Sequence, residues 1–231
     1  MSSIAIRFKE SMKASAESDR MKGLLDASEA EEIRRTSEDY DKFQLVVSSM
    51  DRDLKRMSKM SHSERDKLKS SELIPKYKPI ALDYLKSGSC YRNPILVEVI
   101  IMMMDIGDIP EALELALPAV EQKQPMPKRF KKANLPTFIG DNMIVWATAR
   151  LARDKDIEPY FSDVFSAMTE DGWMVPREVI SKFFKIAGDY ALKEKRLKEA
   201  LDNFITAFEI DPKASKCITK ITQLKKELER A

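Results

Sequence analysis

Apolar residues recur at steps of three and four positions along most of this chain, and that spacing limits the fold more than any other feature. Phe43, Met50 and Met57, for example, follow one another at seven-residue steps and share one face of a helix. No alternating strand pattern bounded by turn residues accompanies them. Glycine, which disfavours helices, is scarce at six of 231 residues. We therefore expect an all-α protein, a helical bundle assembled from helical hairpins.

The chain divides into three regions by composition. Residues 1–36 are charged, rich in serine and sparsely apolar, which predicts a mobile charged N-terminal arm. Residues 37–140 form a central helical region that we expect to bind DNA. It ends in a loop at 121–140, where three prolines disfavour a long helix. Residues 141–231 form a helical C-terminal region, beginning with helix over 141–168.

Turn residues predict how the central helices connect. A helix begins near His62 and is expected to end near Leu73, because Pro75 and Pro79 would interrupt it. A helical hairpin is predicted over residues 94–120, with its turn at Gly107.

The C-terminal region carries the clearest repeat signal. Residues 184–208 match the spacing of a tetratricopeptide repeat, in which a small residue such as Gly188 lets two helices approach and Phe204 fills the groove. With the hairpin at 94–120, this predicts two degenerate repeats rather than a regular array. A last helix with an apolar stripe over 218–228 either caps the domain or pairs with another subunit.

Several chemistries are excluded by what the sequence lacks. There is no phosphate-binding glycine motif of the Walker type. His62 is the only histidine, so a histidine metal site or a triad that needs histidine is excluded. Cys90 and Cys217 are far apart, which indicates free thiols in a reducing cytosol. The longest apolar run, residues 99–104, is too short for a membrane span. We expect no cofactor, no metal and no membrane partner.

The strongest candidate for binding is a cluster of four cations around one aromatic residue in the proline-bounded loop. Its members are Lys128, Arg129, Phe130, Lys131 and Lys132. Lysine and arginine release counterions from DNA phosphates, and an aromatic ring can stack on a base or wedge between bases. The alternative is a solvated loop with Phe130 tucked into the core. A second cluster, Lys67, Lys69, Lys76 and Lys78, is better interpreted as a solvated helix end.

A magnesium-dependent nuclease would need converging carboxylates. Asp105 and Asp108 are the best-placed pair, beside the turn of the hairpin at 94–120. The competing interpretation is structural: Asp108 caps the second helix of the hairpin and Asp105 is solvated. We expect no catalytic residue here, and magnesium would matter only if the nuclease alternative held.

Several motifs follow one another in order along residues 38–230. They are residues 72–79 (Glu-Leu-Ile-Pro-Lys-Tyr-Lys-Pro), 104–116 (Met-Asp-Ile-Gly-Asp-Ile-Pro-Glu-Ala-Leu-Glu-Leu-Ala), Met126-Pro127 with the basic residues after it, Pro136 with Phe138, and 199–204 (Glu-Ala-Leu-Asp-Asn-Phe) with Ala207 and Asp211. Together they resemble the small terminase subunits, often called terminase endonuclease subunits, of contractile-tailed temperate phages that package cohesive-end genomes.

The resemblance implies a role in viral DNA packaging in the cytoplasm of a bacterial host. Such a subunit recognises the packaging site on concatemeric double-stranded phage DNA, and it recruits and regulates a large subunit that carries the ATPase. It also assembles as a homo-oligomer, for which a ring is the family expectation. The family's name attributes endonuclease activity to this subunit, but we expect the nuclease centre to lie in the large subunit. A helical adaptor that binds protein rather than DNA, through a face near Phe184, Tyr190 and Phe204, is a further alternative.

Overall fold

The computed structural model describes residues 37–130 and 134–230, and throughout these residues the regular structure is helical, which confirms the all-α prediction. The predicted arm at 1–36 lies outside the described residues. The chain forms two compact units, residues 1–131 and 132–231. The predicted division into regions at residues 36 and 140 stays a prediction.

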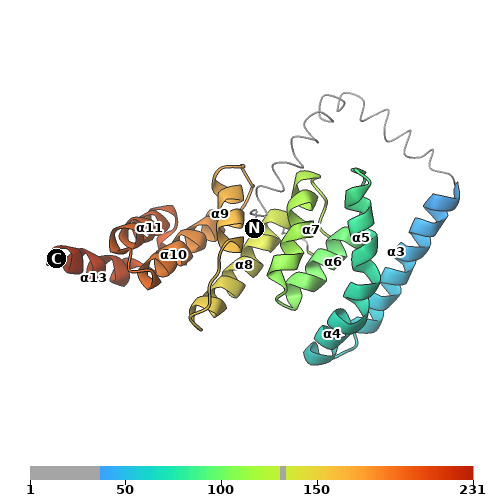
Figure 1. Ribbon diagram of the computed structural model, residues 1–231, viewed down its shortest axis with the longest axis horizontal. Coiled ribbons are helices and arrows are strands. Elements are labelled where there is room, and N and C mark those ends of the chain that lie inside the picture. Colours follow the sequence, from blue (N-terminus) through green and yellow to red (C-terminus); the bar gives the residue numbers. More distant parts are fainter. Residues whose placement is uncertain (1–36, 131–133, 231) are drawn as a thin grey trace, which may run out of the picture. The chain divides into compact units, whose positions relative to one another are not determined.

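The first unit is organised around one helix that is buried on all sides. In chain order its elements are α3 (Ser37–Met57), α4 (His62–Leu68), the π-helical segment η2 (Lys69–Leu73), α5 (Ile74–Lys86), α6 (Pro94–Asp105) and α7 (Ile109–Glu121). Helix α6 packs against α5 and α7 (Figure 1). Every residue from 95 to 104 is buried. A helix that is apolar on all faces is typical of a protein core. Each fully buried Ile, Leu or Met side chain stabilises the folded state by about 1.5–3 kcal/mol.

The turn between α6 and α7 follows the sequence prediction. Asn93 caps α6, its side chain accepting hydrogen bonds from the N–H groups of Ile95 and Leu96. Gly107 adopts a φ of 80°, in the left-handed region that favours glycine. Asp108 then occupies the N-cap position of α7.

The predicted break at Pro75 is wrong, because the helical path continues from α4 through η2 into α5. Within η2 the N–H of Ile74 bonds to the carbonyl of Lys69, five residues back rather than four. The wider turn accommodates Pro75, which has no N–H to donate. The hydroxyl of Ser71 donates to the carbonyl of Lys67, so side chains satisfy part of the loosened backbone. Pro79 lies inside α5.

Helix α3 is joined to its neighbours largely by polar contacts. The Asp53 carboxylate accepts hydrogen bonds from Lys76 Nζ (2.8 Å) and from Tyr77 Oη (2.7 Å). Burial alone would raise the pKa of Asp53, but the hydrogen bonds from Lys76 and Tyr77 outweigh it and hold the pKa below its usual value. Met50 is buried at 2% exposure, whereas Leu45 on the same helix is 69% exposed.

The second unit is likewise built from helices. Its elements are α8 (Leu135–Leu151), α9 (Tyr160–Thr169), α10 (Arg177–Lys193), α11 (Leu197–Ile210), the short α12 (Pro212–Ser215) and α13 (Ile218–Leu228). The loop prediction is wrong for residues 135–140, because Asn134 caps α8 and Pro136 lies in its first turn, where proline needs no partner for its missing N–H. The helix predicted over 141–168 is present as two helices, since α8 ends at Leu151 and α9 starts at Tyr160.

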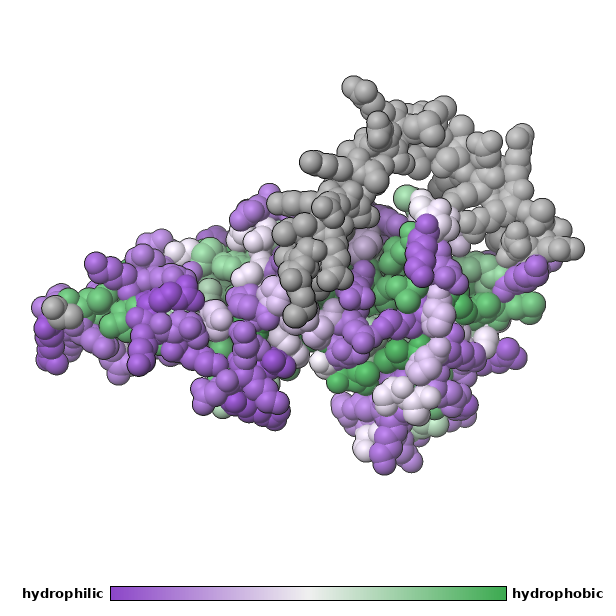
Figure 2. All heavy atoms as spheres, viewed as in Figure 1, coloured by the Kyte–Doolittle hydropathy of each residue, from purple (hydrophilic) through white to green (hydrophobic). Residues whose placement is uncertain are grey.

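A close contact between α10 and α11 holds the C-terminal hairpin. A Cβ atom at Gly188 would lie 2.6 Å from Cε1 of Phe204, so only glycine admits that ring. Phe204 is completely buried, and Ile221 and Leu224 of α13 join the same core. The hairpin therefore packs as the spacing predicted, while its assignment as a tetratricopeptide repeat stays a prediction. On the face shown in Figure 2, hydrophilic residues predominate over α10 to α13.

No helix among the described residues combines the length and the apolar character needed to cross a membrane.

Candidate nucleic-acid interface

The basic loop that follows α7 is fastened to the first unit at two points. At the first, Gln124 is 5% exposed and its side chain is fully engaged. Its Oε1 accepts from the N–H of Asn93 (2.8 Å), and its Nε2 donates to Tyr84 Oη (2.9 Å) and to the carbonyl of Tyr91 (2.8 Å). Because Tyr84 lies on α5 and the other two partners lie in the connection between α5 and α6, the start of the loop is fixed to the core.

The second point is an ion pair between Arg129 and Glu98 of α6. Arg129 Nη2 donates to Glu98 Oε2 at 2.6 Å, and Nη1 donates to Oε1, so the contact is bidentate. The Glu98 side chain is 7% exposed and that of Arg129 is 46% exposed. The hydrogen bond to Glu98 raises the pKa of Arg129 against the opposing effect of burial. The guanidinium also lies 4.8 Å from the ring centre of Phe130.

These contacts separate the predicted binding residues into different roles. Lys128 is exposed, whereas Arg129 is bonded to the core and Phe130 is half-buried. Lys131 and Lys132 lie outside the described residues. The loop therefore presents Lys128 from a fixed backbone, with Arg129 holding it in place. DNA contact by these five residues stays a prediction.

Three of the four lysines in the second basic cluster are engaged inside the unit. Lys69 is 5% exposed and bonded to two carboxylates, Lys76 pairs with Asp53, and Lys78 pairs with Glu111. Only Lys67 of this cluster is exposed without an acidic partner among the described residues. The expectation of a solvated helix end is therefore wrong for the buried Lys69, while Lys76 and Lys78 neutralise acids at the surface of helix contacts.

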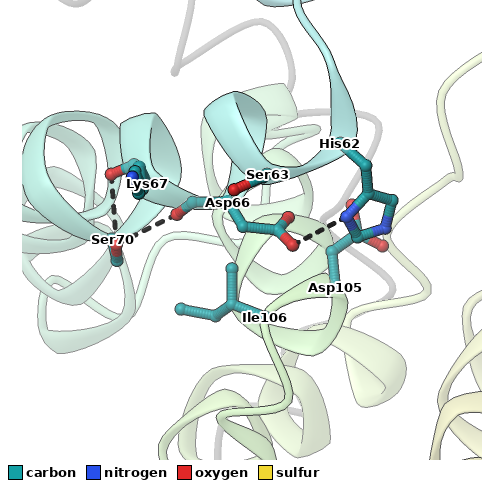
Figure 3. A pocket seen from close by; sticks show the side chains of 7 residues that line it. All are labelled: His62, Ser63, Asp66, Lys67, Ser70, Asp105 and Ile106. Atoms are coloured by element: carbon teal, nitrogen blue, oxygen red, sulfur yellow. Dashed lines mark hydrogen bonds and ion pairs between the residues drawn. The ribbon is translucent and has the colours of Figure 1, made fainter.

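The candidate nuclease residue Asp105 lies at the edge of an open hollow of about 680 Å³ between α4 and the end of α6. Asp66 points toward the ring of His62 in this hollow (Figure 3), with Asp66 Oδ2 at 2.9 Å from His62 Nδ1. The Lys69 ammonium bonds to Asp66 Oδ1 (3.2 Å) and to Asp105 Oδ2 (3.1 Å). Asp105 is thus not simply solvated as expected. A buried ammonium already occupies the position between the carboxylates that a metal ion would need.

Asp108 has different surroundings from Asp105. Burial raises the pKa of its carboxyl, and Glu111 adds to this effect while Lys78 opposes it. It occupies the N-cap position of α7, but its side chain makes no capping hydrogen bond. Within residues 37–130 and 134–230, no three His, Cys, Asp or Glu side chains are grouped as a metal site.

Sequence reasoning missed Glu98 and Gln124, the residues that hold the loop. A signal for Glu98 was present, since it is the only charged residue in the apolar stretch from 95 to 104. A carboxylate buried among apolar residues needs a cationic partner. No comparable signal marked Gln124, because a glutamine beside prolines is ordinary in an exposed loop.

The chain is similar to a protein of Haemophilus phage HP1 (strain HP1c1) described as "probable terminase, endonuclease subunit", with 32% identity over 138 residues. The match covers 60% of this chain and 48% of the relative, so the chain spans about half the length of the curated relative it matches. No solved structure matches the chain significantly. The model of the phage small terminase subunit family matches residues 47–177. Since this match spans more than half of its residues, the chain belongs to the phage small terminase subunit family.

Proposed function

We propose that this protein is the DNA-recognising subunit of a viral packaging machine. It binds the packaging site, the cohesive-end region, on concatemeric phage DNA in the host cytoplasm. It also recruits and regulates a large subunit that carries the ATPase and nuclease. Family membership supports a role in phage DNA packaging. The observation that carries the DNA-binding proposal is the basic loop, which is fixed by Gln124 and Arg129 and presents Lys128.

In this mechanism the loop acts as a rigid contact to the phosphate backbone. Lys128, Lys131 and Lys132 displace counterions from successive phosphates. Arg129 keeps its bond to Glu98 and sets the position of Lys128, while Phe130 packs beneath the guanidinium. Fixing the loop in advance lowers the ordering cost of binding. A homo-oligomer, such as a ring, would repeat the contact and raise a modest single-site affinity by avidity.

An endonuclease is the second candidate, and the description of the Haemophilus phage relative favours it. Asp105 and Asp108 would then hold magnesium. One observation weighs against this role for the pair: the Asp105 carboxylate is bonded to the buried Lys69 ammonium, which occupies a position beside it that a metal ion would need. We therefore propose recognition without cutting by this subunit.

The adaptor alternative depends on aromatic side chains being available to a peptide. Phe204 is completely buried against Gly188, Phe184 packs edge-on against Phe165 with ring centres 4.9 Å apart, and Tyr190 Oη bonds to Asp156. All three rings predicted for that face are engaged within the second unit, so this reading has the least support.

The test is retention of labelled cohesive-end-region DNA by the full chain across a salt series, with and without magnesium. The triple variant Lys128→Gln, Lys131→Gln, Lys132→Gln is compared with Lys59→Gln, an exposed cation of the same unit that has no acidic partner among the described residues. We expect retention by the wild type without magnesium. The triple variant should bind about 10-fold or more weakly with a shallower salt dependence, because each lost phosphate contact removes about 0.9 from the slope of log K against log salt.

Each outcome supports or contradicts one of the three candidate functions. Loss confined to the triple variant supports the loop as the contact. An affinity loss per removed charge that is as large in Lys59→Gln as in the triple variant would indicate that bulk charge alone matters and would contradict it. Magnesium-dependent cutting by the purified chain would favour the endonuclease. Binding to the large subunit without DNA retention would favour the adaptor.

A further inference from the structure

Two basic segments of the second unit, forty residues apart in sequence, meet at one end of α10. The first is the connection between α8 and α9, and the second is the turn between α10 and α11. Tyr190 Oη donates a hydrogen bond to Asp156 Oδ1 at 3.2 Å, and Lys193 Nζ donates to the carbonyl of Lys155 at 3.4 Å. Both segments reverse direction through a residue with positive φ, Asp154 at 54° and Lys195 at 58°. Cations on two short turns are thereby brought to one surface.

Positive charge exceeds negative charge on this surface, which we call the turn surface. Its basic residues are Arg150, Arg153, Lys155, Lys193, Lys195, Arg196 and Lys198, and its acidic residues are Asp154, Asp156, Glu158, Glu194 and Glu199.

Some of these acids are already engaged by neighbours within the unit. Asp156 accepts hydrogen bonds from the N–H of Glu158 and from Tyr190, and the bond to the Glu158 N–H is the main cause of its lowered pKa. Glu199 pairs with Arg196. By contrast, four exposed cations of the turn surface have no acidic partner among the described residues: Arg153, Lys155, Lys195 and Lys198.

Two arginines of the turn surface are stacked on aromatic rings. The Arg150 guanidinium lies 4.9 Å from the ring centre of Trp146, and that of Arg196 lies 5.7 Å from the ring centre of Tyr190. Each guanidinium also donates a hydrogen bond within the unit, that of Arg150 to the carbonyl of Asp156 and that of Arg196 to Glu199. These contacts restrain the two arginines, and the four exposed cations around them are left to match the repeated negative charge of a nucleic-acid backbone.

We propose that the turn surface is a second nucleic-acid contact, on the second unit, that binds the phosphate backbone of duplex DNA. The inference rests on the proposed function, because it adds a contact for the same DNA. The chain as a whole has a net charge of only +2, so its affinity for DNA depends on local concentrations of cations. Because the second contact is on the same chain as the first, it adds avidity wherever both engage DNA.

The experiment uses the full chain and a labelled duplex of mixed sequence, so that only backbone binding is measured. The test variant carries Arg153→Gln, Lys155→Gln, Lys195→Gln and Lys198→Gln. The matched control carries Lys213→Gln, Lys216→Gln, Lys225→Gln and Lys226→Gln. Like the test variant, the control removes four exposed cations of the second unit that have no acidic partner among the described residues. One of them, Lys216, has a positive φ of 52° and so matches Lys195. Thermal unfolding of both variants establishes that they are folded.

We expect the test variant to bind about 10- to 100-fold more weakly than wild type at moderate salt, and its salt slope to be smaller by about two to four. The control should bind within about 3-fold of wild type, since it removes charge but no phosphate contact. Equal losses in both variants would overturn the inference, since they would report net charge alone. Wild-type binding by the test variant would overturn it while leaving the proposed function intact.

Two further outcomes are informative. Wild-type protein that retains neither this duplex nor cohesive-end-region DNA would overturn the proposed function, and the inference with it. A test variant that keeps DNA binding but loses the large subunit would identify the turn surface as a protein-docking site and overturn the nucleic-acid reading.

Discussion

The carboxylate of Glu98, buried on α6, is bonded to both terminal nitrogens of the Arg129 guanidinium in the loop after α7. This pair joins the most basic stretch of the chain to its most apolar helix. A buried carboxylate without its cation is strongly unfavourable, so Arg129 contributes to the fold before it contributes to binding. The neighbouring Lys128 has no such bond and remains available for DNA.

Replacing Arg129 should therefore lower the stability of the protein more than replacing Lys128 does. We expect Arg129→Gln to lower the free energy of unfolding by about 1–3 kcal/mol, because Glu98 is left buried without its partner. Lys128→Gln should change stability by less than about 0.5 kcal/mol, as for most exposed substitutions. Urea denaturation measures both changes. The double variant Glu98→Gln, Arg129→Gln should lose less unfolding free energy than the sum of the losses in Glu98→Gln and in Arg129→Gln. A destabilising Lys128→Gln beside a neutral Arg129→Gln would contradict this assignment.

Asp105 should act as a partner for Lys69 rather than as a metal ligand. The Lys69 side chain is 7% exposed, so Asp105→Asn leaves a buried ammonium with one carboxylate fewer. We expect a loss of about 1–2 kcal/mol in unfolding free energy, measured by thermal or urea denaturation. Adding Lys69→Met should recover part of that loss, because the buried charge is removed. A loss of magnesium-dependent DNA cutting without any loss of stability would instead identify Asp105 as catalytic.

Gly188→Ala should destabilise the second unit although alanine is the better helix former. The added Cβ would lie 2.6 Å from a ring carbon of Phe204, which is completely buried. Overpacking of this kind lowers the free energy of unfolding by about 1–3 kcal/mol. That exceeds the gain of about 0.5–1 kcal/mol that alanine has over glycine inside a helix. Thermal unfolding measures the net effect. Combining Gly188→Ala with Phe204→Leu should reduce the clash; a more stable Gly188→Ala protein would show that the two helices can separate without cost.

The contributions of two carboxyl groups of the first unit to the free energy of unfolding should change with pH in opposite directions. The folded-state pKa of Asp53 is lowered, so its stabilisation is present above the unfolded pKa of about 4 and is lost as pH falls through the lower folded value. The folded-state pKa of Asp108 is raised, chiefly by burial, so its ionised form opposes folding at neutral pH and this penalty disappears as pH falls.

The matched variants are Asp53→Asn and Asp108→Asn, with urea unfolding measured at pH 7 and pH 3. At pH 7 Asp53→Asn should lower stability by about 1–2 kcal/mol through its lost charged hydrogen bonds. Asp108→Asn should be neutral or slightly stabilising, since it removes a charge that burial disfavours. Both differences should shrink at pH 3. A destabilising Asp108→Asn at pH 7 would mean that its charge is favourable in the folded protein.

The sequence by itself determined the features that depend on neighbours within a few positions. Heptad spacing located the helices, Gly107 marked the turn between α6 and α7 by its need for positive φ, and the pairing of Gly188 with Phe204 indicated a close helix contact. Each follows from local geometry or from a small residue opposite a large one.

Only the tertiary structure decided which charges are available. Arg129 and Glu98 are thirty-one residues apart, and their pairing depends on where the loop meets the buried face of α6. In the same way, Lys155 and Lys193 meet only because a turn between α8 and α9 lies against the end of α10. Helical periodicity describes one helix at a time, whereas an ion pair is set by the packing of several. A cation that the sequence predicts to contact DNA can therefore instead neutralise a buried carboxylate in the folded protein.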